Sequence, residues 1–152
     1  MNALPEPLRT GVDVIDSEHA YLIDLLGRLE KVCVRVKSSC DACDAPQIAQ
    51  CDNTLSVLFT EFLDFMSNHF RHEEIFMRTI GLPKNLRDQH TEEHANVSQR
   101  IQALIDRNPN NVVVKPADFH LAIVTWLEDH IKNWDMQIAS HLGLRPLAEG
   151  SC

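Results

Sequence analysis

Apolar residues recur every three or four positions through four long segments, and this helical periodicity most restricts how the chain can fold. The segments cover about residues 17–36, 46–80, 83–107 and 116–142. None shows the strict alternation of apolar and polar residues that is typical of a half-buried strand. The connections are short, which favours antiparallel neighbours. The sequence therefore predicts an all-α protein, an up-down-up-down four-helix bundle over about residues 16–142.

Residues that favour helix ends mark the limits of these segments. Asp44 is a candidate N-cap before Pro46, and Gly81 and Gly143 are candidate C-caps of the second and fourth segments. The first 15 or so residues are expected to form an N-terminal arm, and the last nine a short C-terminal tail. The length of 152 residues suits one domain, so residues 1–152 are expected to form a single domain.

The charge balance and the apolar runs exclude several classes of function. The chain has 22 acidic and 14 basic residues, a net charge of −8, which argues against binding to nucleic acid or to an anionic membrane surface. No apolar run reaches the roughly 18–20 residues that cross a bilayer, and no signal-peptide pattern opens the sequence. We expect a cytoplasmic protein without membrane insertion.

Histidines lie inside the apolar stripe of every predicted helix, and the second stripe also carries a carboxylate. These residues are His19, His69, Glu73, His90, His94 and His130. One such histidine alone is more often a core residue bonded to a carbonyl than a metal ligand. Five histidines with a glutamate are not explained in that way, because burying an unpaired carboxylate costs several kcal/mol. A bound metal ion would supply the missing positive charge.

The spacing within two of the stripes suits metal binding. His69 and Glu73 are four residues apart, and so are His90 and His94. Residues at this spacing share one face of a helix, so that two side chains can bind the same ion. Each pair alone is a weak signal, and together they are a strong one.

Four segments resemble the motifs of the hemerythrin family, most closely those of its single-domain bacterial members. They are IDSEH (15–19), HFRHEE (69–74), HTEEH (90–94) and WLEDHIKNWD (126–135). Met77 followed by Gly81-Leu82-Pro83 also fits the family's connection between its second and third helices. The resemblance covers about residues 10–142.

This resemblance implies a non-haem di-iron site that binds dioxygen reversibly. By the family pattern, one iron is held by His90, His94 and His130, the other by His19 and His69, and both are bridged by Glu73 and Asp135. A solvent-derived oxo or hydroxo group is the third bridge. Counting these ligands leaves one position open on the iron held by His19 and His69, and dioxygen is expected there.

The spacing of the last two implied ligands leaves their geometry open. Asp135 follows His130 by five residues, which places the two about 140° apart on an ideal α-helix. Either Asp135 reaches in from the flank, or a local π-bulge brings the two side chains together. Trp126 and Leu127, one turn before His130, are expected to form the wall of the dioxygen pocket, with plain core packing as the alternative.

The remaining histidines and the cysteines are not assigned to the metal site. His72, His120 and His141 are expected to have surface or structural roles. The cysteines are Cys33, Cys40, Cys43, Cys51 and Cys152. Free thiols are favoured because no export signal is present, while a disulfide or a metal site is left open.

Three functions remain in competition, and the leading one is not enzymatic. It is dioxygen binding for carriage, storage, delivery or sensing. The alternatives are a di-iron enzyme that handles peroxide or nitric oxide, and a sensory module that acts through a separate protein partner, which the sequence does not identify. Five nitrogen donors against two carboxylates favour binding, because fewer anionic ligands stabilise high-valent iron less; ferritin-like oxidases instead carry paired Glu-x-x-His motifs.

Overall fold

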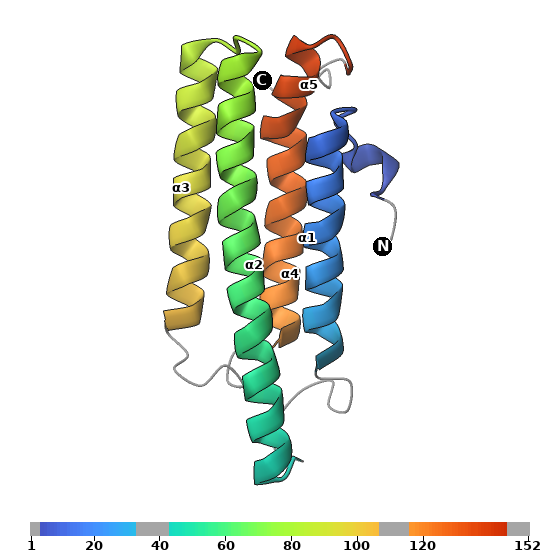
Figure 1. Ribbon diagram of the computed structural model, residues 1–152, viewed down its shortest axis with the longest axis vertical. Helices are drawn as coiled ribbons and strands as arrows, with labels where there is room; N and C mark the ends of the chain where they lie inside the picture. The colour runs from blue at the N-terminus through green and yellow to red at the C-terminus, as the bar shows by residue number, and fades with distance from the viewer. Residues whose placement is uncertain (1–3, 33–42, 107–115, 146–152) are drawn as a thin grey trace.

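In a computed structural model of the chain, four long helical stretches lie side by side as a bundle (Figure 1). The structure describes residues 4–32, 43–106 and 116–145, and these contain no strand, which confirms the all-α prediction. The helices are η1 (Glu6–Leu8), α1 (Asp13–Val32), α2 (Ala45–Thr79), α3 (Lys84–Asp106), α4 (Pro116–His130), the π-helical η4 (Ile131–Asp135) and α5 (Met136–His141). Over the same ranges, no helix is both long and apolar enough to span a membrane.

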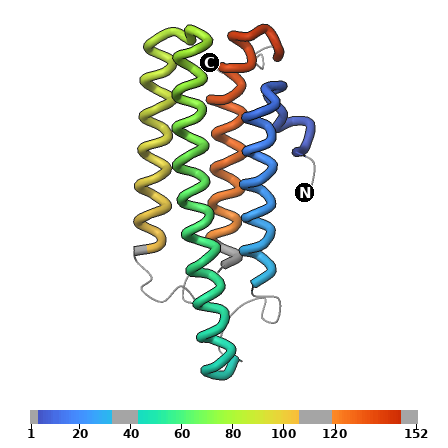
Figure 2. The backbone as a smooth tube through the Cα atoms, in the orientation of Figure 1, coloured from blue at the N-terminus to red at the C-terminus, as the bar shows by residue number. Residues whose placement is uncertain are grey.

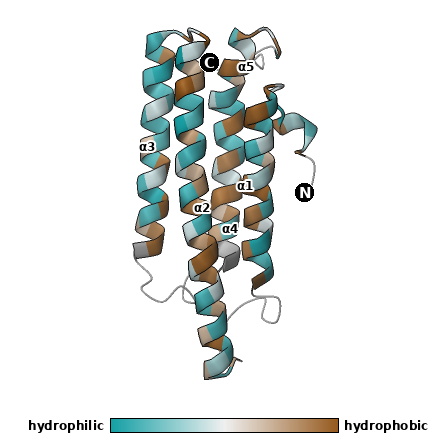
Figure 3. Ribbon diagram, viewed as in Figure 1, coloured by the Kyte–Doolittle hydropathy of each residue, from teal (hydrophilic) through white to brown (hydrophobic). Residues whose placement is uncertain are grey.

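The apolar stripes of the helices meet in one core. Helix α1 packs closely against α2 and α4, and α3 packs against α2. Apolar and hydrophilic residues interchange along every helix, as expected where one face is buried (Figure 3). The largest fully buried apolar side chains include Leu22, Leu25 and Leu26 of α1, Leu55 and Phe62 of α2, and Ile101 of α3. The start of α2 extends beyond the neighbouring helices (Figure 2).

The helix ends follow the predicted capping residues. The Asp44 carboxylate accepts a hydrogen bond from the backbone N–H of Gln47 at 2.9 Å, and the Gln47 side chain accepts one from the backbone N–H of Asp44 at 3.0 Å. This capping box satisfies two donors that the start of α2 would otherwise leave unpaired. Gly81 and Gly143 have φ of +70° and +72°, which confirms them as left-handed residues that end helices.

The N-terminal arm is shorter than predicted, because α1 begins at Asp13 and not near Ser17. The cause is the carboxylate of Asp16, which reaches back to the chain before the helix. It accepts hydrogen bonds from the backbone N–H and the hydroxyl of Thr10, both at 2.8 Å, and from the backbone N–H of Gly11 at 3.0 Å. These bonds fix the turn into α1, so the helix can start four residues earlier than the predicted start at Ser17.

The rest of the arm is also ordered against the bundle. Leu4 and Leu8 are buried and belong to the main core cluster. Arg145, after the last helix, donates a hydrogen bond to the carboxylate of Glu6 at 2.8 Å. The segment before α1 is therefore part of the folded unit.

The fourth helical stretch is not uniform, and its irregular segment lies at the spacing that the sequence left open. It is α-helical to His130, π-helical from Ile131 to Asp135, and α-helical again from Met136. A π-helical turn contains more residues than an α-helical one and therefore changes the direction of the side chains that follow. The structure thus has the bulge, and the flank alternative is wrong.

We expect Asp16→Ala to destabilise the protein by about 2 kcal/mol, because it leaves the buried donors of Thr10 unpaired. Asp13→Ala is the matched control: this exposed carboxylate in the first turn of α1 should contribute only about 0.5 kcal/mol through the helix dipole. Urea unfolding in the presence of a chelator measures both values. Equal losses for the two variants would contradict the role given to Asp16.

Candidate metal centre

The residues predicted as ligands lie together inside the bundle. They come from all four helical stretches: His19 (α1), His69 and Glu73 (α2), His90 and His94 (α3), His130 (α4) and Asp135 (η4). None exposes more than 3% of its surface. Seven ionisable side chains in the dry interior of a helical bundle require a compensating arrangement of charge.

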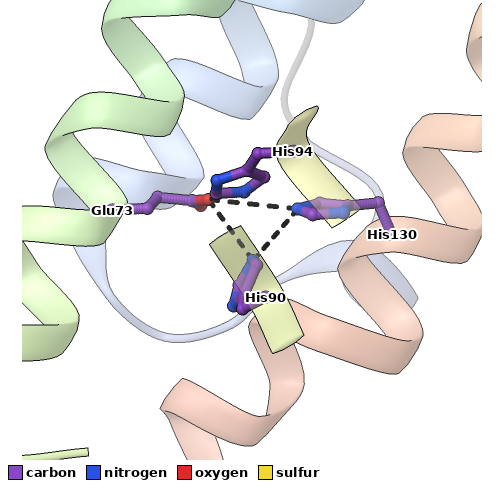
Figure 4. A group of neighbouring side chains, drawn as sticks. All are labelled: Glu73, His90, His94 and His130. Carbon is purple, nitrogen blue, oxygen red and sulfur yellow. Dashed lines mark hydrogen bonds and ion pairs between the residues drawn. The ribbon is translucent and has the colours of Figure 1, made fainter. Parts of the chain in front are cut away.

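Four of these side chains form the first group, from α2, α3 and α4. Figure 4 shows the imidazoles of His90, His94 and His130 gathered around the end of Glu73. The Oε2 atom of Glu73 lies 3.2 Å from His94 Nε2, 3.7 Å from His90 Nε2 and 3.9 Å from His130 Nε2. One ligand atom from each residue lies within 4.8 Å of all the others, which is close enough to surround one cation.

The second group consists of His19, His69 and the same Glu73. Here the other carboxylate oxygen is used: Glu73 Oε1 lies 3.4 Å from His69 Nε2 and 3.7 Å from His19 Nε2. Glu73 therefore presents one oxygen to each group, and the two groups are adjacent.

Asp135 divides its two oxygens in the same way. Its Oδ2 lies 3.1 Å from His19 Nε2 of the second group. Its Oδ1 lies 3.2 Å from both His90 Nε2 and His130 Nε2 of the first group. The π-helical segment makes this possible, because it turns Asp135 toward the same interior as His130. Two carboxylates thus stand between two clusters of imidazoles.

The hydrogen bonding of these atoms tests whether the residues fit a metal. Many of the inward atoms are buried without a hydrogen-bond partner: His19 Nε2, His69 Nε2, His94 Nε2, both oxygens of Glu73 and both oxygens of Asp135. An unsatisfied buried polar group costs about 1–3 kcal/mol, and a charged one costs more. Such a set of nitrogen and oxygen donors fits a pair of divalent cations, since each cation would pair with the orphaned atoms of its group.

Two further carboxylates orient ligand imidazoles from behind, and sequence reasoning did not assign them a role. The Nδ1–H of His69 donates to Glu18 at 2.8 Å, and the Nδ1–H of His94 donates to Glu74 at 3.2 Å. Each bond places the proton on Nδ1 and leaves the Nε2 lone pair directed inward. Both glutamates lie next to a predicted ligand in the sequence, and that adjacency could have indicated them.

Aromatic rings pack against the three-histidine group. Phe70, which sequence reasoning also missed, stacks on the ring of His94 with centroids 4.0 Å apart and planes within 8°. The ring centroids of Trp126 and His130 are 4.9 Å apart, and the indole N–H of Trp126 donates to the carboxylate of Glu93 at 3.3 Å. Leu127 is buried in the main core cluster. The predicted place of Trp126 and Leu127 over the open position stays a prediction.

Burial and the opposite charges act against each other on the pKa values of the site. Burial lowers the pKa of His130, but the carboxylates of Asp135 and Glu73 outweigh it and raise that pKa to about 10. Burial raises the pKa of Glu73, yet His69, His130 and His94 hold it far below its usual range. The pKa of Asp135 is lowered in the same way, chiefly by His130. Without metal, protons on the imidazoles thus supply part of the positive charge.

The remaining histidines lie where surface or structural roles were expected. His72 is exposed, and its Nδ1 lies 2.6 Å from Glu18. His120 lies 3.7 Å from Glu30, and exposed His141 donates to the carbonyl of Ile80 at 3.2 Å.

Two of the five cysteines fall within the described ranges. Cys43 and Cys51 are free, in agreement with the favoured thiol state. The predictions for Cys33, Cys40 and Cys152 lie outside the described residues.

Comparison with known proteins identified one family. The model of the hemerythrin HHE cation binding domain matches residues 10–142. This span contains both groups of imidazoles and both shared carboxylates. No curated protein and no solved structure matched the chain.

The raised pKa of His130 predicts how the stability of the metal-free protein depends on pH. A folded-state pKa of about 10 against 6.5 for a free imidazole means that protonation stabilises the fold fully below about pH 6.5. This contribution is lost as the pH rises toward 10. Unfolding free energies in chelator should therefore fall between about pH 7 and pH 9.5.

The metal-loaded protein is the control for this experiment. A bound cation takes the place of the proton, so the loaded protein should not lose stability over the same pH range. A flat profile in chelator, or the same decline with and without metal, would contradict the electrostatics described above.

Proposed function

Because the chain belongs to the hemerythrin HHE cation-binding family, we propose that it binds dioxygen reversibly at a pair of iron ions. His90, His94 and His130 would hold one ion, His19 and His69 the other, and Glu73 and Asp135 would bridge both. The observation that carries the proposal is that each bridging carboxylate presents one oxygen to each group of imidazoles. We also propose that the four helical stretches are connected up-down-up-down, as the sequence predicts.

The ligand set suits iron that alternates between its ferrous and ferric states. A bound iron pair would supply the two electrons that dioxygen takes up on binding and returns on release. Five neutral imidazoles and only two carboxylates limit the stabilisation of higher oxidation states. The apolar surroundings of the site, with Phe70 stacked on His94, keep bulk water away from the ligands.

The buried polar side chains all have a role in the binding proposal or in the fold. Among residues 4–32, 43–105 and 119–145, whose burial the structure describes, the buried polar side chains are Thr10 and the seven proposed ligands. Thr10 is bonded to Asp16 in the N-terminal turn. The proposal thus assigns these buried groups to the metal ions and to one turn, and gives none of them a role in proton transfer. We therefore propose that the protein carries, stores, delivers or senses dioxygen and is not an enzyme.

The alternative is a di-iron enzyme that turns over peroxide or nitric oxide at the same site. The two proposals differ in reversibility. A binding protein returns to its starting state when dioxygen is removed, and an enzyme consumes its substrate. The same spectroscopic experiment therefore separates them.

We expect the protein purified with iron to contain two irons per chain. The anaerobic ferrous protein should gain visible absorption bands in air and lose them again when dioxygen is removed. His94→Ala should lose iron, because it removes a donor and leaves Glu73 poorly paired. His141→Ala is the matched control, since exposed His141 bonds only to a backbone carbonyl and should leave the iron content unchanged.

Two results would count against this proposal. Irreversible bleaching together with consumption of peroxide or nitric oxide would favour the enzyme. One iron per chain, or none, in unmutated protein supplied with iron would remove the paired site itself.

Leu127 provides a test of the proposed pocket wall. Leu127→Asn should leave the iron content nearly intact but shorten the lifetime of the oxygenated form, because a polar side chain opens a path for water beside His130. Leu127→Ala should act in the same direction, and Trp126→Ala more weakly. The measurement is the decay of the oxygenated absorption band in air-saturated buffer.

Ile123→Ala is the matched control for this series, since Ile123 is equally buried on α4 one turn earlier. It should lower stability by about 2–5 kcal/mol, like other large-to-small core changes, without changing the decay rate. Unchanged decay in both Leu127 variants would leave Leu127 as a core residue only.

A further inference from the structure

The metal centre is closed to solvent, so a cation must reach it past other side chains. Its ligands expose at most 3% of their surfaces. Two partly exposed carboxylates contact them from outside: Glu18, 15% exposed, behind His69, and Glu74, 26% exposed, behind His94. Among the described residues, these are the two places where a partly exposed charged side chain contacts a buried ligand.

Glu18 differs from Glu74 because it contacts a second imidazole in addition to that of the buried ligand. One oxygen of Glu18 lies 2.8 Å from His69 Nδ1, and the other lies 2.6 Å from His72 Nδ1. The side chain of His72 is 57% exposed. Within the described ranges, Glu74 has no exposed imidazole as a partner. Among the described residues, Glu18 and His72 are thus the one place where a carboxylate and an accessible nitrogen donor lie next to a buried ligand.

A hollow in the surface also opens at Glu18. It has a volume of about 800 Å³ and lies between the N-terminal arm, the outer face of α1 and Phe65 of α2. Its lining carries four carboxylates (Glu6, Asp13, Asp16 and Glu18) against two guanidinium groups (Arg9 and Arg145).

The positive charges of the hollow are gathered at one place. Both arginines pair with Glu6, at 3.7 Å and 2.8 Å. The carboxylate of Asp16 is held by uncharged donors, so its charge is not cancelled. The excess of negative charge therefore lies along α1, toward Glu18. A concave surface with such an excess raises the local concentration of cations.

We propose that Glu18 and His72 form a loading site, where an incoming divalent cation is first bound before it passes to the buried centre. The carboxylate and the imidazole nitrogen would replace two of the cation's water ligands, a donor pair that suits ferrous iron and its analogue cobalt(II). The step is an exchange of ligands, with no electron transfer. This inference rests on the proposed metal centre but not on its reaction with dioxygen.

The ring of His69 connects the loading site to the interior. Its Nδ1 faces Glu18, and its Nε2 lies 3.4 Å from Glu73 Oε1. A cation held at Glu18 is therefore one imidazole ring away from the two-histidine group. The geometry points to filling of the centre from this side, with His19 and His69 as the first buried ligands that the cation meets.

Cobalt(II) uptake by the metal-free protein tests the loading site without dioxygen. Stopped-flow absorption follows the appearance of the cobalt bands, and metal analysis gives the final content. His72→Gln keeps a hydrogen-bond donor to Glu18 but removes the nitrogen ligand. We expect uptake on the order of tenfold slower in this variant, with the final cobalt content and the melting temperature unchanged.

His120→Gln is the matched control, since His120 is also a partly exposed histidine near a glutamate of α1. Among the described residues, however, this glutamate (Glu30) neither lines the hollow nor contacts a proposed metal ligand. This variant should load at the parent's rate. His72→Ala should be as slow as His72→Gln, which shows that the lost nitrogen and not the new amide is responsible. Uptake by the parent should also slow with increasing salt concentration, as cation steering requires.

Equal uptake rates in the parent and His72→Gln would overturn the loading site, and so would an equal slowing in His120→Gln. Either result would leave the proposed function intact, because both proteins would still bind metal. Conversely, a protein that loads cobalt as described but shows no reversible dioxygen bands would overturn the proposed function and leave the loading site standing.

Discussion

The structure depends on two carboxylates, Glu73 and Asp135, that are buried completely among imidazoles. Such groups are among the costliest that a protein interior can hold, and removing one partner of a buried charged set is strongly destabilising. Their oxygens have no hydrogen-bond partners, while the five surrounding histidines direct Nε2 atoms at them. The interior is therefore arranged around positive charge, supplied by protons in the metal-free chain and by cations in the loaded one.

The fold serves this arrangement by bringing one or two ligands from each helical stretch to the same level. Four-residue spacing places His69 with Glu73 and His90 with His94 on inward faces, while ordinary leucine and phenylalanine packing holds the rest of the bundle. The exception is Asp135, which requires a π-helical segment. Such segments are rare in ordinary helices, and this one turns the carboxylate of Asp135 toward the imidazoles of both groups.

Much of this was predictable from the sequence, because helical periodicity and buried polar residues are local signals. The helices and the set of inward histidines follow from spacing, and the capping by Asp44 follows from the residue types that favour helix ends. The early start of α1 could not be predicted in this way, since it depends on hydrogen bonds from Thr10 to the Asp16 side chain. Adjacency to a predicted ligand could have indicated Glu18, but not its partners on the next helix. Glu18 supports His69 from 51 residues away, and its contact with His72 gives an exposed residue a specific partner.

In the proposed metal centre, two cations lie next to each other, each with its own imidazoles and both sharing Glu73 and Asp135. The most direct measurement is a crystal structure of the iron-loaded protein with data collected at the iron absorption edge. We expect two anomalous peaks between the two carboxylates, one beside His90, His94 and His130 and the other beside His19 and His69. A single peak, or a pair of peaks at which either carboxylate contacts only one ion, would contradict this arrangement.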